Sequence, residues 1–134
     1  MKNVPSGYQE DKGRINMSED QETAAIQRLQ KKLTKETLFM YILRLLQDKE
    51  RYAYELREEI NNRFGFTMAT VTSYVILYQM EREKLVVSNK KVSKTGRPDR
   101  KYYEITNKGR QVMVEAKAFL TETLEKVFDK TPGP

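Results

Sequence analysis

The residues best suited to a chemical task lie between Lys84 and Arg110. This segment holds nine Lys and Arg residues and only two acids, Asp99 and Glu104. Its positive charge therefore exceeds the net charge of +6 carried by the whole 134-residue chain. Cationic side chains at this density bind phosphates and other anions, which predicts a surface that faces a polyanion. From charge alone, nucleic acid binding and simple solubility explain the basic chain about equally well.

The side chains that most enzymes depend on are missing. The chain has no histidine and no cysteine, which removes the commonest general base, the commonest metal ligand and all disulfides. No phosphate-binding glycine loop and no carboxylate pair stands out. We therefore expect no catalytic residues, no metal site and no cofactor. No long apolar run or targeting segment is present, which predicts a cytoplasmic protein that does not enter a membrane.

Two short strands are expected to frame the basic segment. Residues 85–87 begin the first strand, and residues 100–105 form the second, with Tyr103 and Ile105 on one face. The eight residues 92–99 between them are too many for a tight turn. The spacing therefore predicts a β-hairpin with a long basic tip, the wing of a winged helix.

Arg97 is the wing residue that we most expect to contact a partner. Pro98 biases Arg97 to an extended backbone, and Gly96 permits close approach to a neighbouring surface. The delocalised charge of Arg97 suits either paired phosphate contact or insertion into a narrow minor groove. The alternative is that the tip is merely solvated.

The N-terminal part of the chain is expected to be peripheral. Residues 1–18 hold too little apolar surface to fold alone and are predicted to be a flexible tail. Ser18 and Gln21 match a capping box before apolar residues at helical spacing, which predicts an extra helix over residues 19–33. Lys35 follows a basic helix end, and this charge either complements the helix dipole or extends a phosphate-binding surface.

Three helices are expected before the hairpin. The first begins after a Thr34 cap and is apolar nearly all round, as a central core helix should be. A charged connection over residues 48–51 leads to a second helix over residues 52–64, which Gly65 ends by supplying a left-handed residue. After a short break a third helix begins, so a helix-turn-helix that reads DNA is possible.

The third helix is expected to end near residue 84, with Thr67 or Thr70 as its cap. Its outward face is too apolar to lie in solvent. A helical projection places Ser73, Ile76, Leu77, Met80 and Lys84 around one direction, so the expected core side is Ile76, Leu77 and Met80. The opposite face holds Val71, Tyr74, Val75, Tyr78 and Arg82. In a DNA interface its hydroxyls would meet phosphates or base edges, and Val71 or Val75 would meet thymine methyls. The alternative is that the N-terminal helix covers this face.

Together these arguments give a set of candidate DNA-binding residues from the helix, the wing and the N-terminal region. They are Lys35, Thr70, Thr72, Ser73, Tyr74, Val75, Tyr78, Lys94, Arg97, Arg100 and Lys101.

The final helix is expected over residues 107–129, with Thr106 as its cap. Its apolar stripe is too wide for one small domain to bury, and a symmetric dimer is the simplest closed solution. The predicted domains are thus a winged helix-turn-helix over residues 34–106 and a dimerisation helix over residues 107–130. The candidate interface residues are Phe119, Leu120, Leu124, Val127 and Phe128. The alternative is that this helix folds back on Leu29 and Leu33 of its own subunit.

The order and the amino-acid sequence of these elements resemble those of the PadR family of transcriptional regulators over residues 33–128. The most specific match is Gly-Arg-Pro at 96–98, followed by Arg-Lys-Tyr-Tyr at 100–103 and Ile-Thr-Asn-Lys-Gly-Arg at 105–110. Ala-Tyr-Glu-Leu at 53–56 resembles a segment of the family's second helix, and Tyr74 matches its characteristic recognition-helix tyrosine. This chain departs from the family's pattern at Ala53, Val75 and Lys84, where glycine, proline and glycine are common.

The resemblance implies a mainly α fold with a small β-hairpin, that is, a winged helix-turn-helix with a C-terminal dimerisation helix. It further implies a homodimer that binds double-stranded DNA as a transcription regulator, a repressor by preference. Similar regulators bind small aromatic or cationic effectors near the dimer interface, which here would involve Tyr41 or Phe119; both would otherwise be core filler. The alternative function is a winged-helix module that binds another protein through Val71, Val75 and Tyr78.

Overall fold

The computed structural model describes residues 22–129, which divide into two units, residues 22–36 and residues 37–129. The first unit contains α2 (Ala24–Lys32), whose first turn is capped by Thr23, since its Oγ1 accepts a hydrogen bond from the Ile26 amide at 3.3 Å. The helix predicted over residues 19–33 therefore begins later than expected, because residues 22 and 23 are not helical. The predicted capping box around Ser18 lies outside the described residues.

Thr34 does not cap the next helix, so that prediction is wrong. Its hydroxyl instead donates to the Gln30 carbonyl oxygen at 2.6 Å, back toward α2. Glu36 is the last residue of the first unit. Its carboxylate pairs with the Lys32 Nζ at 2.9 Å, and this hydrogen bond lowers the pKa of the Glu36 carboxyl.

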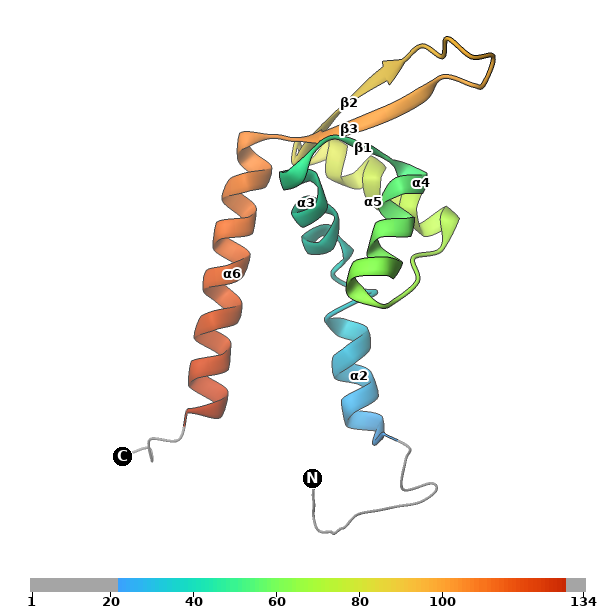
Figure 1. The fold of residues 1–134 in the computed structure, drawn as a ribbon. Coiled ribbons are helices and arrows are strands. Elements are labelled where there is room, and N and C mark those ends of the chain that lie inside the picture. The colour runs from blue at the N-terminus through green and yellow to red at the C-terminus, as the bar shows by residue number, and fades with distance from the viewer. Residues whose placement is uncertain (1–21, 130–134) are drawn as a thin grey trace. The chain divides into compact units, whose positions relative to one another are not determined.

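The second unit is a winged helix. Its elements are α3 (Leu38–Asp48), β1 (Arg51–Tyr52), α4 (Ala53–Glu59), the π-helical turn η1 (Ile60–Phe64), α5 (Thr70–Arg82), β2 (Val86–Lys91), β3 (Arg100–Ile105) and α6 (Asn107–Phe128) (Figure 1). The predicted mainly α fold with a small β-hairpin is confirmed. The core helix α3 buries five side chains, and α4, α5 and the sheet pack on it. The five are Leu38, Ile42, Leu43, Leu45 and Leu46.

The sheet has one strand more than predicted. β3 lies between β1 and β2, both antiparallel to it, with Arg51 opposite Tyr103 and Val86 opposite Ile105. β1 falls where only a charged connection was expected. Arg51 is nevertheless buried, and its Nε donates to the carbonyl oxygen of Leu45 in α3 at 3.3 Å. This bond satisfies a carbonyl near the end of α3 and joins the core helix to the sheet.

The helix-turn-helix is formed by α4, η1 and α5. Gly65 ends the first part with φ of 78°, the left-handed conformation predicted for it. The N-cap residue of α5 is Ala69, whose side chain cannot cap a helix. The prediction that Thr67 or Thr70 caps this helix is therefore wrong. After α5 the chain turns at Lys84, whose φ of 63° is unusual for a residue with a side chain.

α6 begins where the sequence predicted. The Thr106 Oγ1 accepts from the Gly109 amide at 3.0 Å and donates to the Lys84 carbonyl oxygen at 2.7 Å. The first turns of α6 pack on α3 and β3 through the half-buried Val112 and Met113. Among residues 22–129, no helix combines the length and apolarity that a membrane span requires.

Candidate nucleic-acid interface

The outward face of α5 is the most unusual surface of the second unit. Val71 is 75% exposed, Tyr74 55%, Val75 61% and Tyr78 63%, whereas Leu77 on the opposite side is fully buried. The two faces predicted by helical projection are confirmed. Thr70 and Thr72 are also exposed. This face therefore offers apolar groups and hydroxyls side by side, with no charge in its first turns.

Ser73 is a correction to the predicted site. Its side chain is fully buried. Its hydroxyl donates to the Thr70 carbonyl oxygen at 2.6 Å and accepts from Arg57 at 3.0 Å. Both hydrogen-bonding roles are thus filled inside the protein, and the expected contact between Ser73 and DNA is wrong. The helical projection placed Ser73 around the same direction as Ile76, Leu77 and Met80, which is consistent with its burial.

Arg57 is a residue that sequence reasoning missed. It lies in α4, and its guanidinium sits 5.6 Å from the Tyr54 ring centre and 5.8 Å from the Tyr74 ring centre. Together with the hydrogen bond to Ser73, these contacts tie α4 to the first turn of α5. Tyr54 and Arg57 are three apart on one helix, but no sequence signal revealed their partner in α5. Arg57 therefore lies against the ring of Tyr74 on the side of α4.

The wing tip, residues 92–99, is ordered by its own polar groups. Asp99 accepts from the Ser93 amide at 2.9 Å, and Ser93 Oγ accepts from the Thr95 amide at 3.2 Å. Gly96 has φ of 81°, so a left-handed residue turns the tip. Lys94 and Arg97 are exposed and form no ion pair with any described residue. Their charges are available to a partner.

Cations at the base of the wing have partners within the protein. The Arg100 guanidinium lies 4.3 Å from the Tyr52 ring centre, and Lys101 pairs with Glu81 of α5 at 3.4 Å. Lys91 forms an ion pair with Glu50, and this hydrogen bond raises the pKa of Lys91. These contacts hold the hairpin against β1 and α5. Of the four predicted wing cations, two lie at the tip and two at the base. Those at the tip are Lys94 and Arg97, and those at the base are Arg100 and Lys101.

A hollow of about 340 Å³ brings several predicted residues together. Tyr74 from α5 and Arg100 and Lys101 from β3 share it with the start of α4. Burial raises the pKa of Tyr103 at its floor, so this phenol stays protonated. The lining residues are Tyr52, Ala53, Tyr54, Tyr74, Asp99, Arg100, Lys101 and Tyr103. Lys35 belongs to the first unit, so its place relative to this hollow is not defined.

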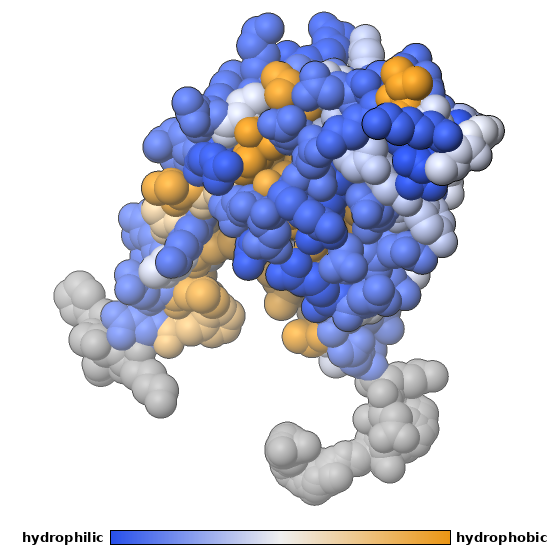
Figure 2. Space-filling model, turned by 45° about the horizontal axis from the view of Figure 1, so that its top comes forward, coloured by the Kyte–Doolittle hydropathy of each residue, from blue (hydrophilic) through white to orange (hydrophobic). Residues whose placement is uncertain are grey.

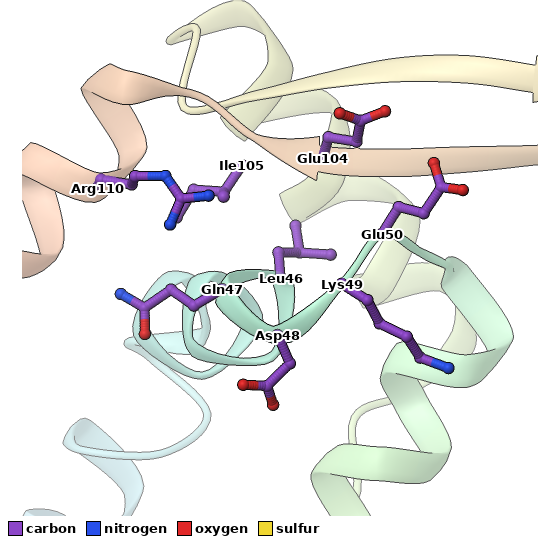
Figure 3. Close-up of a pocket in the computed structure, with 8 residues that line it drawn as sticks. All are labelled: Leu46, Gln47, Asp48, Lys49, Glu50, Glu104, Ile105 and Arg110. Carbon is purple, nitrogen blue, oxygen red and sulfur yellow. The ribbon is translucent and has the colours of Figure 1, made fainter.

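A second hollow, of about 320 Å³, lies between the end of α3 and the junction of β3 with α6 (Figure 3). Its acids have partners: Asp48 pairs with Arg44 at 2.9 Å and Arg63 at 3.0 Å, and these hydrogen bonds lower the pKa of Asp48 to about 2. Glu50 pairs with the wing. Figure 3 shows Arg110 on the opposite side of the hollow from Glu50. The charges here connect structural elements and do not converge on a ligand.

The end of α6 carries hydrophobic side chains on the surface, visible as the orange group beside the grey C-terminal residues at lower left in Figure 2. Four of the five predicted interface residues are exposed, and Leu120 is half-buried. The exposed ones are Phe119, Leu124, Val127 and Phe128. Tyr41, considered for an effector, packs edge to face against Phe64 and Phe66 at 5.1 and 5.0 Å, as expected of core filler.

Comparisons with known proteins agree with this architecture. A PadR-like transcriptional regulator from Bacillus cereus is 33% identical, with a TM-score of 0.60 over 78% of this chain and 99% of its own. A PadR-like transcription factor from Bacteroides fragilis is 26% identical, with a TM-score of 0.63 over 75% of this chain and 95% of its own.

An uncharacterised protein from Lysinibacillus sphaericus is 35% identical over 88 residues, which are 63% of this chain and 72% of that protein. Residues 42–115, from the core helix α3 into α6, match the transcriptional regulator PadR-like family. That match spans the helix-turn-helix, the wing and the joint with α6, so the chain belongs to the PadR-like family of transcriptional regulators.

Proposed function

We propose that this chain is a dimeric, sequence-specific regulator of transcription that binds double-stranded DNA and acts as a repressor. One observation carries the proposal: Tyr74 of the exposed α5 face and the basic residues Arg100 and Lys101 of the wing line one hollow. A helix that enters the major groove while its wing follows the flanking backbone needs this arrangement. Lys94 and Arg97 at the tip then neutralise phosphates.

A gel retardation assay with duplexes from the region upstream of the gene tests the proposal. Binding should be strong at low salt and collapse between roughly 50 and 200 mM salt, because neutralised phosphates release counterions. Arg97→Ala should reduce the slope of log affinity against log salt by about one contact per subunit, which is about two for the dimer. Lys117→Ala, an exposed cation on α6, is the matched control and should leave the slope unchanged. Equal binding by this protein and a neutral control protein at low salt would refute the proposal.

Dimerisation through α6 is the second part of the proposal. Phe119 and Phe128 are 67% and 70% exposed, and a symmetric contact would bury them in both subunits. Phe119→Glu should shift the mass measured by light scattering from dimer to monomer and weaken operator binding, since two linked half-sites become one. A small aromatic or cationic effector bound beside Phe119 would alter DNA affinity, which the retardation assay detects when such compounds are added.

Repression is the third part. A dimer that covers an operator near its own promoter blocks transcription there, so a reporter fused to that promoter should become more active when the gene is deleted. A reporter that becomes less active would identify an activator instead.

The exposed apolar residues of α5 also suit a protein partner, and salt separates the two functions. A mainly apolar protein contact should persist at 200 mM salt, whereas DNA binding through the wing should not. If the protein fails to bind DNA yet retains a salt-resistant partner at the Val71, Val75 and Tyr78 face, the interaction-module alternative replaces the proposal.

A further inference from the structure

We infer that α5 recognises thymine through its C5 methyl group, with Val71 and Val75 as the residues that contact it. The inference rests on the proposed DNA binding and adds the chemistry by which a sequence is chosen. It follows from the exposed valines of α5, from the absence of Lys and Arg in residues 70–80, and from the apolar groups that the major groove presents.

The exposed side chains of α5 lack the usual readers of guanine. Residues 70–80 contain no Lys and no Arg, the residues that bind guanine O6 and N7 most often. Arg57, the nearest cation in α4, is engaged by Ser73. Arg82 lies in the last turn, with its guanidinium 5.9 Å from the Tyr78 ring centre. The first three turns of the helix therefore cannot read guanine with a cationic side chain.

Val71 and Val75 are the most exposed aliphatic residues of this helix, at 75% and 61%. Both carry only methyl groups, and they lie one turn apart on the same side. Of the groups that the four base pairs present in the major groove, only the thymine C5 methyl is apolar. A helix that places two valines in that groove gains apolar burial only where thymines are present.

Gln79 agrees with this preference. It is exposed and lies one turn beyond Val75 on the same side of the helix. A glutamine amide is suited to N6 and N7, the groups that adenine, the partner base of thymine, presents in the major groove. The side chains on this face thus select the two bases of an A·T pair.

The helix spacing predicts where the contacted thymines lie. Val71 and Val75 are separated by about 6 Å along the axis, because each residue of an α-helix rises about 1.5 Å. Consecutive base pairs are about 3.4 Å apart along the DNA axis, so the two methyl groups should lie at most about two base pairs from each other. This spacing gives the inference a positional form that single substitutions can test.

The experiment uses one upstream fragment prepared in two forms. Amplification with dUTP in place of dTTP removes every thymine methyl outside the primers and leaves Watson–Crick pairing unchanged. Binding is measured by retardation for both forms. We expect the uracil form to bind about fourfold more weakly for each methyl that loses an apolar contact, the factor given by burial of one methylene-sized group. Single uracils at mapped positions then locate the two thymines.

Protein variants assign the effect to the valines. Val71→Ala and Val75→Ala should each reduce the affinity ratio between the thymine and uracil forms, and both sites are exposed, so folding should be unaffected. Val114→Ala, at an exposed valine on α6, should leave the ratio unchanged. A thermal unfolding curve for each variant confirms that the fold is retained.

Each outcome separates this inference from the proposed function. Equal binding of the two DNA forms overturns methyl recognition and leaves DNA binding intact. If neither form binds, both proposals fail. If the ratio survives in both valine variants, or is abolished by Arg97→Ala instead, the uracil effect arises from groove shape and the valines do not read methyl groups.

Discussion

Replacing Gly109 with alanine sets two known effects against each other. Gly109 lies in the first turn of α6, and on an isolated helix alanine would be favoured over glycine by about 1 kcal/mol. In this fold, however, an added Cβ would lie 2.4 Å from the Leu85 carbonyl oxygen and 2.8 Å from Ile105 Cγ1. Neither distance is tolerable, and the nearer atom belongs to the backbone.

The structure indicates which effect is larger. The Leu85 carbonyl also accepts the Thr106 amide hydrogen bond at 3.1 Å, so it cannot move without disturbing the start of α6. Overpacking of this kind typically costs about 1–3 kcal/mol, occasionally more. A 2.4 Å approach to a backbone atom places this cost near the upper end of the range, at about 3 kcal/mol. Because the helix preference offsets about 1 kcal/mol of it, Gly109→Ala should destabilise the protein by roughly 2 kcal/mol. The sign is therefore opposite to that of an ordinary glycine-to-alanine change in a helix.

Urea unfolding followed by far-UV circular dichroism measures this free energy, at one protein concentration for all variants because a dimer's stability depends on concentration. Thr121→Ala, an exposed substitution on the same helix, is the control and should change stability by no more than a few tenths of a kcal/mol. A Gly109→Ala protein as stable as the natural one, or more stable, would refute the close packing of α6 on the Leu85 backbone.

Three further substitutions test separate contacts. Asp48→Asn should destabilise the protein at neutral pH, because the pKa of Asp48 is lowered from 3.8 to about 2 in the folded state. The difference in the free energy of unfolding between this variant and the natural protein, measured with urea, should shrink as the pH falls from about 4 to about 2. Lys84→Gly should raise stability by about 0.5–1 kcal/mol in the same assay, because glycine adopts a φ of 63° without strain. Arg57→Lys keeps the charge but loses the planar contact with Tyr74, so retardation assays should show weaker preference for operator over random DNA at similar non-specific affinity.

The features that sequence reasoning predicted correctly are local ones. The two faces of α5 follow from the helical repeat alone, which is why Leu77 is buried and Val71 exposed. The Thr106 cap and the Gly65 stop each depend on a few neighbouring residues. The long wing tip follows from the number of residues between two strand patterns. Signals of this kind need no knowledge of the rest of the fold.

The features that were missed depend on contacts between distant segments. β1 is only two residues long, too short for any periodic pattern, and it exists because β3 pairs with it. Arg57 and Ser73 are 16 residues apart, and only the packing of α4 on α5 joins them. Capping was mispredicted for a different reason. More than one threonine lies near the starts of α3 and α5, and a hydroxyl such as that of Thr34 bonds back to the preceding helix equally well.

The joint between α5 and α6 relates the two halves of the proposed function. The turn after α5 places the Lys84 carbonyl against the Thr106 hydroxyl, and the Leu85 carbonyl against Gly109 in the first turn of α6. The proposed DNA-reading helix and the proposed dimer helix therefore meet within a few residues, with no flexible linker between them. In a symmetric dimer, this joint sets the distance between the two copies of α5. Under the proposed function, substitutions at Lys84, Thr106 or Gly109 should therefore change the half-site spacing that the dimer prefers, whereas substitutions on the outward face of α5 should change which bases are read.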